Sequence, residues 1–495
     1  MKEHLFYLEP KPGLSLQVQI KEMLVSAILD GHLAPGDPLP SNRKLAQTLN
    51  VSRNTVVFVY EKLLEEGYIV SRERQGHFVD PDIDLAQLAA SPEVTADVQD
   101  ETIPAAEWSS RFRLQPQVPK HLAKAKQWRH CRYSFIYGQL DPELFPVSEW
   151  RECTRQATSN LLTRDWLGDS ADADDPMLIE QLRSRVLPRR GIRCSADEIL
   201  VTLGTQQSLY ILAQLLAGPG VRVGLENPGY SDVRHIFNLT GALINPLSID
   251  AEGVVVNASL QDSDYLFVTP SHQAPTTVTM SMARRKALLQ CAENRDQIII
   301  EDDYENEINF FGPPAPALKS LDKSGRVIYV GSLSKTLSPG LRIGYMVGPA
   351  EFIAQARALR HLMLRHPPSN NQRTLALFLA GGHHDTLLRR LTATYRERYD
   401  CLVKALQTHL PEMRISNTTG GSSLWLEGPE DLDTEALQER ALRNSLFFEP
   451  ARTLFFGDTV VKNCFRLGYS SIKTEDIEPG IKLLAELIHN PDYHH

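Results

Sequence analysis

From about residue 131 onward, short apolar runs alternate with longer stretches in which apolar residues recur at helical spacing. The runs have the length and composition of buried strands: Ile199–Leu203, Arg222–Leu225, Tyr265–Val268, Gln297–Ile300 and Val327–Val330. Neighbouring parallel strands need a crossover connection, which is usually a helix. The alternation therefore predicts an α/β domain built on a mainly parallel sheet.

The chain changes character twice before this α/β region, and its 495 residues exceed the usual size of one domain. Residues 14–79 carry short helical patterns that end in a hairpin. Between about 80 and 130, proline, alanine and acidic residues occur without sustained periodicity, as in a linker. We expect an N-terminal domain at residues 1–80, a linker at 81–130 and a large domain at 131–495.

Composition argues against some classes of protein. Hydrophobic residues make up 42% of the chain, but no apolar run approaches the roughly 18 residues of a membrane helix. The opening residues have acidic side chains on both sides of a very short apolar run, unlike a signal peptide. The six cysteines are scattered and lack metal-ligand spacing, so we expect a reduced, cytoplasmic protein without a metal site or membrane span.

Two short helices joined by a tight turn are predicted in the N-terminal domain. Ser41 is a good N-cap for a helix that runs through Leu49, and Ser52 can cap the next helix. In such a helix-turn-helix, the second helix enters the DNA major groove by its N-terminus. Its first side chains can then reach base edges or phosphates: Arg53, Asn54 and Thr55.

A hairpin after the second helix can form a wing, because Tyr68–Val70 and His77–Val79 can pair around Arg72 and Gly76. Basic side chains, Arg43 among them, cluster at the expected DNA side. The net charge of -9 argues by itself against a nucleic-acid binder, but a small basic face can exist in an acidic chain. The alternative is a helical protein-interaction module with the same apolar pattern.

Lys335 lies in a run rich in small and hydroxyl-bearing residues, Gly331–Gly344, directly after the apolar stretch Arg326–Val330. It would therefore stand on a loop at the end of a strand, with Ser332 and Arg342 nearby. A primary amine can form a Schiff base with an aldehyde cofactor, while hydroxyls and a guanidinium can hold a phosphate dianion. The run thus indicates a pyridoxal phosphate site; the alternative is a solvated surface lysine.

Such a site also needs a carboxylate that keeps the ring nitrogen of the cofactor protonated. Glu301–Tyr304 follows the apolar run Ile298–Ile300, at the end of a strand where open α/β sheets bind ligands. Asp302 is the better candidate for the ring nitrogen, and Tyr304 could reach the phenolic oxygen. The alternative is a Mg²⁺ or Ca²⁺ site with the ligands Glu301, Asp302, Asp303 and Glu305. This alternative is weaker, because alternate residues of a strand point to opposite faces and would split the cluster.

Three further turns follow predicted strands. The turn Gly204–Gln206 opens a helix whose free backbone N–H groups could cradle a phosphate. Tyr230 could stack on a flat ring or pack as an ordinary surface tyrosine. His272 and Gln273 are available to the ring hydroxyl, although an isolated histidine in a loop is usually solvated.

About 65 residues of the N-terminal domain closely resemble the winged helix-turn-helix of the GntR family of bacterial regulators. The motifs that carry the resemblance are Leu39-Pro-Ser-x-Arg43-x-Leu-Ala, Val51-Ser-Arg-x-Thr55-Val and the glycine of the wing. The resemblance implies that Arg43, Arg53 and Thr55 lie at the DNA, and that Gly76 shapes the wing tip.

From about Phe135 to Ser470 the chain resembles the fold-type I aminotransferases, and more closely the MocR subfamily of GntR regulators. Part of this resemblance lies in the opening motif Tyr137-Gly-x-x-Asp141-x-x-Leu-Phe145-Pro. It implies a mainly parallel sheet with a smaller C-terminal α+β lobe. It also implies head-to-tail, domain-swapped homodimers that bind paired half-sites on double-stranded DNA.

The resemblance further implies a role for each residue of the site. Lys335 is implied as the Schiff-base lysine, Asp302 as the partner of the ring nitrogen and Tyr304 as the partner of O3′. Arg466 matches the arginine that clamps a substrate carboxylate, and Arg452 is a second candidate for that role. The remaining implied cofactor contacts are Tyr230, Ser332, Arg342, Gly204, Thr205, Gln206 and His272.

Two segments depart from the family pattern. Leu167–Pro176 replaces the usual Gly-Tyr-x-Asp-Pro-x-Gly, which allows an altered or unusually acidic ligand entrance. Pro275–Thr277 replaces the usual Pro-Thr-Gly, which weakens the assignment of His272 and Gln273 to the cofactor.

These patterns predict a transcriptional regulator that senses an amine or amino acid through an external aldimine formed in place of Lys335. A clamp arginine favours an anionic amine, whereas acidic residues at the entrance would suit a diamine or a basic amino acid. Two alternatives stay open: a regulator that responds to pyridoxal phosphate itself, and a working aminotransferase with an accessory DNA-binding module.

Overall fold

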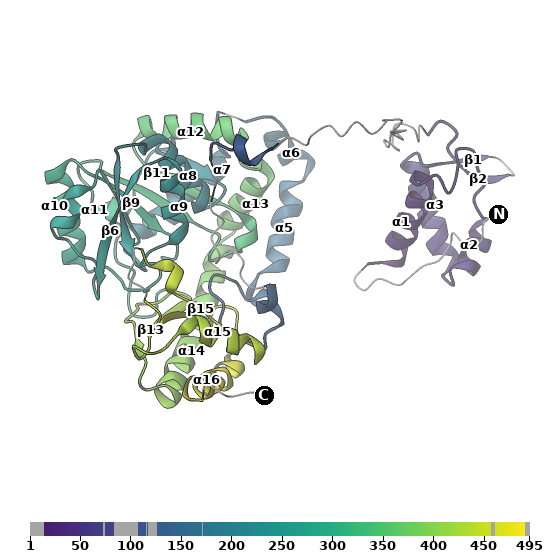
Figure 1. The fold of residues 1–495 in the computed structure, drawn as a ribbon. Coiled ribbons are helices and arrows are strands. Elements are labelled where there is room, and N and C mark those ends of the chain that lie inside the picture. Colours follow the sequence, from purple (N-terminus) through teal and green to yellow (C-terminus); the bar gives the residue numbers. More distant parts are fainter. Residues whose placement is uncertain are drawn as a thin grey trace. The chain divides into compact units, whose positions relative to one another are not determined.

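The computed structural model describes residues 14–72, 75–83, 107–114, 116, 126–170, 172–456 and 461–490. The chain divides into two compact units, Met1–Arg111 and Phe112–His495 (Figure 1). Most of the predicted linker at 81–130 lies outside the described residues.

The described part of the N-terminal unit contains the helices α1 (Leu16–Leu29), α2 (Asn42–Thr48) and α3 (Arg53–Glu65). A serine caps each helix by accepting a hydrogen bond from the backbone N–H three residues further on; these caps are Ser15, Ser41 and Ser52. Serine is a favoured N-cap because its oxygen satisfies one of the N–H groups that the first turn leaves without a partner.

The helices pack through one apolar face each, and the fully buried residues of this small core include Ile20, Leu24, Val56 and Leu63. A hairpin of β1 (Ile69–Arg72) and β2 (Gly76–Val79) follows α3, with Arg72 opposite Gly76 at its tip. Gly76 has a φ of +105°, which favours glycine at this position. The predicted helix-turn-helix with a wing is confirmed.

An eight-stranded sheet forms the centre of the second unit. Its strands lie side by side in the order β4 (Ile199–Thr202), β11 (Gly344–Val347), β10 (Val327–Ser332), β9 (Ile298–Asp303), β8 (Tyr265–Val268), β5 (Arg222–Asn227), β6 (Leu243–Asp250) and β7 (Gly253–Val254). The five strands from β10 to β6 are parallel. β11 runs antiparallel to both of its neighbours, and β7 runs antiparallel to β6. The sequence pattern did not indicate these antiparallel strands.

Helices cover both faces of this sheet (Figure 1). One face packs against α8 (Thr205–Leu216), α9 (Ser231–Leu239) and α12 (Ala350–Leu364), and part of the other against α10 (Met282–Arg295) and α11 (Leu318–Leu321). Along β10, Ile328 and Val330 join the first core, while Val327 joins the second. Alternate side chains of a strand point to opposite faces, so a strand covered on both sides must be apolar at nearly every position.

A second sheet forms the core of the C-terminal lobe, in the order β12 (Arg414–Ile415), β13 (Ser423–Glu427), β16 (Cys464–Gly468) and β15 (Glu449–Pro450). The helices of this part of the unit include α13 (Ser369–Ala380), α14 (His383–His409), α15 (Thr434–Arg443) and α16 (Thr474–His489). Before the main sheet lie α5 (Val147–Ala157), α6 (Asn160–Trp166) and α7 (Pro176–Gln181). Two short strands, β3 (Tyr133–Ser134) and β14 (Leu446–Phe447), pair in parallel.

The predicted fold class is therefore confirmed: a winged helix-turn-helix, then a mainly parallel sheet with a smaller α+β lobe. Among the described residues, no helix combines the length and the apolar composition needed to cross a membrane.

Candidate functional site

Lys335 lies in the loop that follows β10, next to the end of β9. Its Nζ atom is 4.1 Å from the ring centroid of Tyr137 and 6.0 Å from that of Tyr304. Gly138 has a φ of +75°, which favours glycine, and a Cβ atom there would lie 2.8 Å from this Nζ, so the segment after Tyr137 passes close to the lysine. The predicted lysine thus stands in an aromatic, partly buried environment rather than on the solvated surface.

Asp302 lies at the carboxyl end of β9, where the parallel register pairs it with Val330 of β10. Its side chain is buried, and Oδ1 has no hydrogen-bond partner among the described residues. Burial, assisted by the charge of Asp303, raises the pKa of Asp302 to about 8, while Lys335 acts in the opposite direction. A buried carboxylate oxygen without a partner fits the N–H of a protonated pyridine ring.

The turn between β4 and α8 and the side chain of Arg342 lie together and form the predicted phosphate site, which we call the anion pocket. Gly204 has a φ of +77°, and a Cβ there would lie 3.1 Å from Arg342 Nη2. Arg342 Nη2 also donates to the carbonyl of Leu203 (3.0 Å). Thr205 and Gln206 form the first turn of α8, whose N–H groups have no acceptor within the helix. Backbone donors and a guanidinium therefore converge as a phosphate requires.

A cavity of about 520 Å³ adjoins this turn and is lined by Leu203, Gln206, Gln207, Tyr210, Ile236, Arg342 and Met363. Ser332, at the end of β10, accepts a hydrogen bond from the backbone N–H of Ser334 (3.2 Å). Gln206 and Arg342, which are both predicted phosphate contacts, thus line one cavity, and Ser332 stands on the strand that leads to Lys335.

Tyr230 connects Gln206 of the anion pocket to the carboxylate of Asp232. Its hydroxyl hydrogen-bonds to Gln206 Oε1 (2.8 Å) and to Asp232 Oδ2 (3.1 Å). Burial raises the pKa of Tyr230, and the Asp232 carboxylate acts in the same direction. Asp302 adds a smaller effect of the same sign, and Arg342 one of opposite sign. That Tyr230 stacks on a cofactor ring stays a prediction.

His272 and Gln273 have different surroundings. His272 is buried, neither ring nitrogen has a hydrogen-bond partner among the described residues, and burial lowers its pKa. The Gln273 amide donates to Glu226, Pro228 and Ala274, and its oxygen accepts from Thr276. Of these two residues, only His272 therefore has ring nitrogens that are available to hydrogen-bond a ligand. The departure at Thr277 is visible in its φ of +63°, a conformation that usually favours glycine.

Arg466 comes from β16 of the C-terminal lobe, far along the chain from the residues of the anion pocket. Its guanidinium carbon is 3.7 Å from the ring centroid of Tyr137, the ring that Lys335 also contacts. Nε and Nη2 both donate to Oε2 of Glu449 (3.1 and 2.7 Å). Arg452, the second clamp candidate, is exposed and ion-paired with Glu435 (2.7 Å), so it does not join this cluster.

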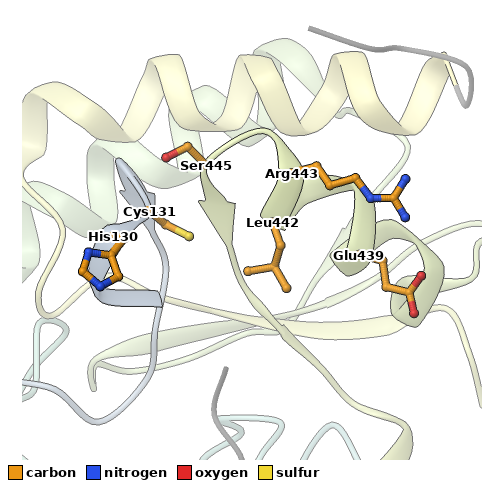
Figure 2. Close-up of a pocket in the computed structure, with 6 residues that line it drawn as sticks. All are labelled: His130, Cys131, Glu439, Leu442, Arg443 and Ser445. Atoms are coloured by element: carbon orange, nitrogen blue, oxygen red, sulfur yellow. The ribbon is translucent and has the colours of Figure 1, made fainter. Parts of the chain in front are cut away.

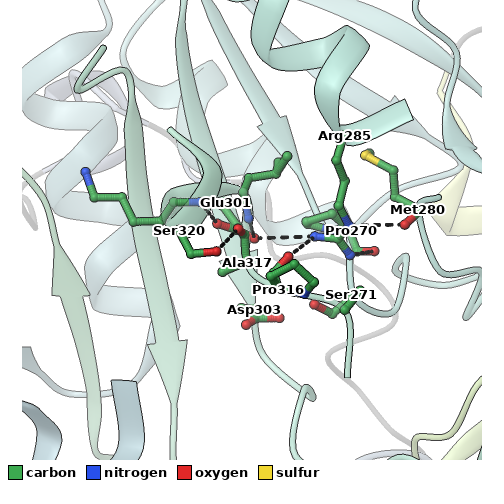
Figure 3. Close-up of polar contacts among 12 residues, drawn as sticks. Pro270, Ser271, Met280, Arg285, Glu301, Asp303, Pro316, Ala317 and Ser320 are labelled. Carbon is green, nitrogen blue, oxygen red and sulfur yellow. Dashed lines mark hydrogen bonds and ion pairs between the residues drawn. The ribbon is translucent and has the colours of Figure 1, made fainter. Parts of the chain in front are cut away.

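A buried polar framework supports the loops around the site. Arg285 donates to the carbonyls of Pro270, Met280 and Pro316, and Glu301 accepts from two backbone N–H groups of α11 (Figure 3). Arg190 joins Asp303 (2.7 Å) to Ser271. Glu301 and Asp303 thus serve the framework, and no group of metal ligands is present within the described ranges.

The acidic segment after α6 is paired with arginines. Asp174 contacts Arg357 (2.8 Å) and Arg360 (2.5 Å), and Asp175 contacts Arg373 (2.7 Å). Asp169 also lies against an arginine, Arg365. Three of the four aspartates in this segment are therefore paired with arginines, and Asp172 is exposed. The acidic ligand entrance stays a prediction.

A further cavity of about 500 Å³ lies away from these residues (Figure 2). His130, Cys131, Glu439, Leu442, Arg443 and Ser445 line it. None of the predicted site residues belongs to it, and we assign it no role.

In the N-terminal unit, the predicted DNA contacts lie on the surface. Arg43, Arg53, Asn54 and Arg72 are exposed. Ser41 and Ser52 are engaged as helix caps, and the Ser52 hydroxyl also hydrogen-bonds to that of Thr55 (2.8 Å). The Arg72 guanidinium lies 4.5 Å from the ring centroid of Phe78, which holds it at the hairpin.

Sequence reasoning missed two residues of the site as functional candidates, Tyr137 and Glu449. The sequence did contain a signal for Tyr137, because this residue precedes a glycine in the opening motif of the aminotransferase-like region. Glu449 had none, because its position opposite Arg466 follows from the register of β15 and β16.

Comparisons with known proteins agree with this geometry. The description "Bacterial regulatory proteins, gntR family" matches residues 16–79, and "Aminotransferase class I and II" matches residues 143–484. The chain is 40% identical to the HTH-type transcriptional regulator TauR of Rhodobacter capsulatus, over 98% of both chains. It is 32% identical to the probable rhizopine catabolism regulatory protein MocR of Rhizobium meliloti, over 94% of this chain and 92% of that protein.

Among solved structures, an α-aminoadipate aminotransferase of Thermus thermophilus superposes with a TM-score of 0.68 at 28% identity. The match covers 78% of this chain and 98% of that one, whose ligand is N-(5′-phosphopyridoxyl)-L-leucine. The family and the unpaired Asp302 oxygen both fit pyridoxal phosphate as the cofactor. The chain belongs to the MocR subfamily of GntR-family transcriptional regulators, which join a helix-turn-helix unit to an aminotransferase domain.

Proposed function

We infer that this regulator binds pyridoxal phosphate and an amine effector in its second unit, and that effector binding changes how its N-terminal unit binds DNA. The observation that supports this most is the convergence of two cations on one ring: Lys335 Nζ and Arg466 Cζ both lie within 4.1 Å of the Tyr137 centroid. An amine held at the first position can place an acidic group at the second.

Several side chains would hold the cofactor. Asp302 would pair with the ring nitrogen, Tyr304 and His272 with the ring oxygen, and Tyr230 would stack on the ring. Arg342 and Ser332, with the turn Gly204–Gln206, would bind the phosphate. The aldehyde of the cofactor would supply a reversible covalent link to a primary amine, first that of Lys335.

Arg466 is the proposed contact for an acidic group of the effector, and this makes an amino acid, an ω-amino acid or taurine a suitable class. When such an amine takes the place of Lys335, the lysine becomes a free amine beside Tyr137 and Tyr304, and its change of charge and position alters the loop after β10. Arg452 is the weaker candidate, because it is exposed and does not contact Tyr137, the ring that lies against both Lys335 and Arg466.

The N-terminal unit would bind double-stranded DNA through α3 and the wing. Arg53, Asn54 and Thr55 begin α3, and Arg43 and Arg72 flank it with exposed positive charge. We propose that a domain-swapped homodimer presents two such units to paired half-sites in the cytoplasm, because a twofold dimer matches a two-part operator.

The experiment that tests this function is a titration of the cofactor-loaded protein with a panel of amino acids, ω-amino acids, diamines and taurine. Visible absorption reports each binding event. A shift with one compound that persists supports a sensor. No visible band after incubation with the cofactor would remove the proposal.

A second candidate, a working aminotransferase, is favoured by the same residues, because Lys335, Asp302 and Arg466 are the groups that transamination needs. Repeated release of a keto acid in that titration would establish it. A third outcome, DNA affinity that depends on the cofactor but on no amine, would identify the cofactor as the signal.

A further inference from the structure

The predicted clamp arginine already has an acidic partner. Glu449 and Arg466 stand opposite each other in neighbouring antiparallel strands, β15 and β16. The side chains are 15% and 14% exposed, so the pair lies largely out of solvent. Both Nε and Nη2 of the arginine donate to a single oxygen of Glu449, at 3.1 and 2.7 Å.

This contact occupies one edge of the guanidinium. An arginine binds a carboxylate most strongly through two parallel N–H groups, and the Nε–Nη2 edge is one of the two edges that allow it. Nη1 donates to no residue in the described part of the chain. The face of the guanidinium is covered by Tyr137. An acidic group of an effector must therefore bind at the end that carries Nη1.

The pair also changes the charge of the pocket. With Glu449 in place, Arg466 contributes almost no net positive charge, although it still offers hydrogen-bond donors. A second acidic group on the effector would lie in a poorly solvated pocket beside the Glu449 carboxylate, and like charges repel strongly where water is excluded.

We propose that Glu449 is a specificity-determining residue of the effector site. It admits an amine that carries one acidic group, which binds at the Nη1 end of Arg466, and it disfavours an amine that carries two. The effector class is thus a monoacidic amine. This inference rests on the proposed amine-binding function of the site.

Glutamine and glutamate make a matched pair of probes, because they have nearly the same shape and differ by one acidic group. The measurement is the dissociation constant of each, from visible absorption of the cofactor-loaded full chain. The wild type should bind glutamine more tightly than glutamate. In Glu449→Gln, which keeps a hydrogen-bond acceptor for Arg466, the ratio should shift toward glutamate by at least about tenfold.

Two variants serve as controls. Glu449→Asp keeps the charge and should retain the preference for glutamine. Glu435→Gln removes a carboxylate of the same lobe that pairs with the exposed Arg452, and its ratio should equal that of the wild type. The visible band of each loaded variant, before any amine is added, shows whether the cofactor site is intact.

An unchanged ratio of the glutamine and glutamate dissociation constants in Glu449→Gln would overturn the proposal. Binding of neither amino acid by either protein would also overturn it, because removing the opposing charge would then have had no effect. These failures are distinct from failure of the proposed function, in which the wild type responds to no amine of the wider panel.

Discussion

The two units of this regulator place their functional side chains in opposite environments. In the N-terminal unit, Arg43, Arg53 and Arg72 are exposed around a small apolar core to which they contribute nothing. In the second unit, Asp302 is 4% exposed and His272 is 2% exposed. The predicted DNA contacts can therefore change without cost to the fold, whereas Asp302 and His272 are also part of its core.

The difference in burial affects the stability of the two units. A buried carboxylate or imidazole without a partner destabilises the folded state, and such cost is expected where a ligand later supplies the partner. Exposed arginines carry no such cost, because water solvates them until DNA arrives. We therefore expect ligand binding and stability to be coupled in the second unit and independent in the first.

The largest effect is expected from Lys335→Ala. The variant should keep its fold and lose the visible band of the covalently linked cofactor, because the amine that forms the link is absent. Absorption spectra of the variant and of Lys323→Ala, a control at an exposed lysine, provide the measurement. An unchanged band in Lys335→Ala would contradict the assignment of this lysine.

Asp302→Asn should weaken cofactor binding by roughly 10- to 150-fold, which corresponds to about 1.5–3 kcal/mol for a hydrogen bond to a charged group. Equilibrium titration of the apo variant with pyridoxal phosphate measures the change in affinity. Affinity equal to that of the wild type would mean that another group faces the ring nitrogen.

The same variant tests the coupling to stability. The pKa of Asp302 is raised to about 8, so between the ordinary carboxyl pKa of about 4 and about 8 the folded protein holds a proton that the unfolded chain has released. The stability of the apo second unit should therefore fall as pH rises through this range. The midpoint temperature of Asp302→Asn should fall less between pH 6 and pH 8.5 than that of the wild type or of Asp172→Asn, an exposed control.

In the N-terminal unit, Arg53→Ala should lower DNA affinity by about 1–3 kcal/mol and leave the unfolding temperature unchanged. Gel-shift titrations at several salt concentrations give the affinity and, from the salt dependence, the number of DNA phosphates that each protein neutralises. Lys21→Ala is the control, because Lys21 pairs with Glu66 (2.5 Å) at the far end of α3. An equal drop in affinity for the two variants would place the DNA elsewhere.

The smallest effect is expected from Ser52→Ala, which removes the cap of α3. The stability of the N-terminal unit should fall by about 1 kcal/mol, with the second unit unaffected. Calorimetry of the whole chain can resolve the two transitions. Ser71→Ala, at an exposed position of β1, should change neither transition.

The sequence predicted the N-terminal unit well because its signals are local. Ser41 and Ser52 cap helices at the predicted positions, and Gly76 stands at the wing with a positive φ. Each of these features depends on neighbours within a few residues, so a single segment carries the information. The parallel strands β5, β8, β9 and β10 were predicted for the same reason, since each contains a short apolar run, whereas β6, which lacks such a run, was not predicted.

The site in the second unit could be predicted only in part. Lys335 and Asp302 follow predicted strands, and adjacent parallel strands bring their ends together. The contact of Lys335 with Tyr137, and that of Arg466 with Glu449, join segments far apart along the chain. The ion pair between Asp174 and Arg360 also joins segments far apart along the chain. No local sequence pattern indicates that these acidic side chains are already paired with arginines.

The measurement that tests the central claim most directly follows DNA affinity and visible absorption in one titration of the cofactor-loaded protein with an amine that binds. The account predicts that both signals change with the same midpoint concentration in the wild type, because one binding event must couple both sites. A spectral change that leaves DNA affinity constant would contradict it.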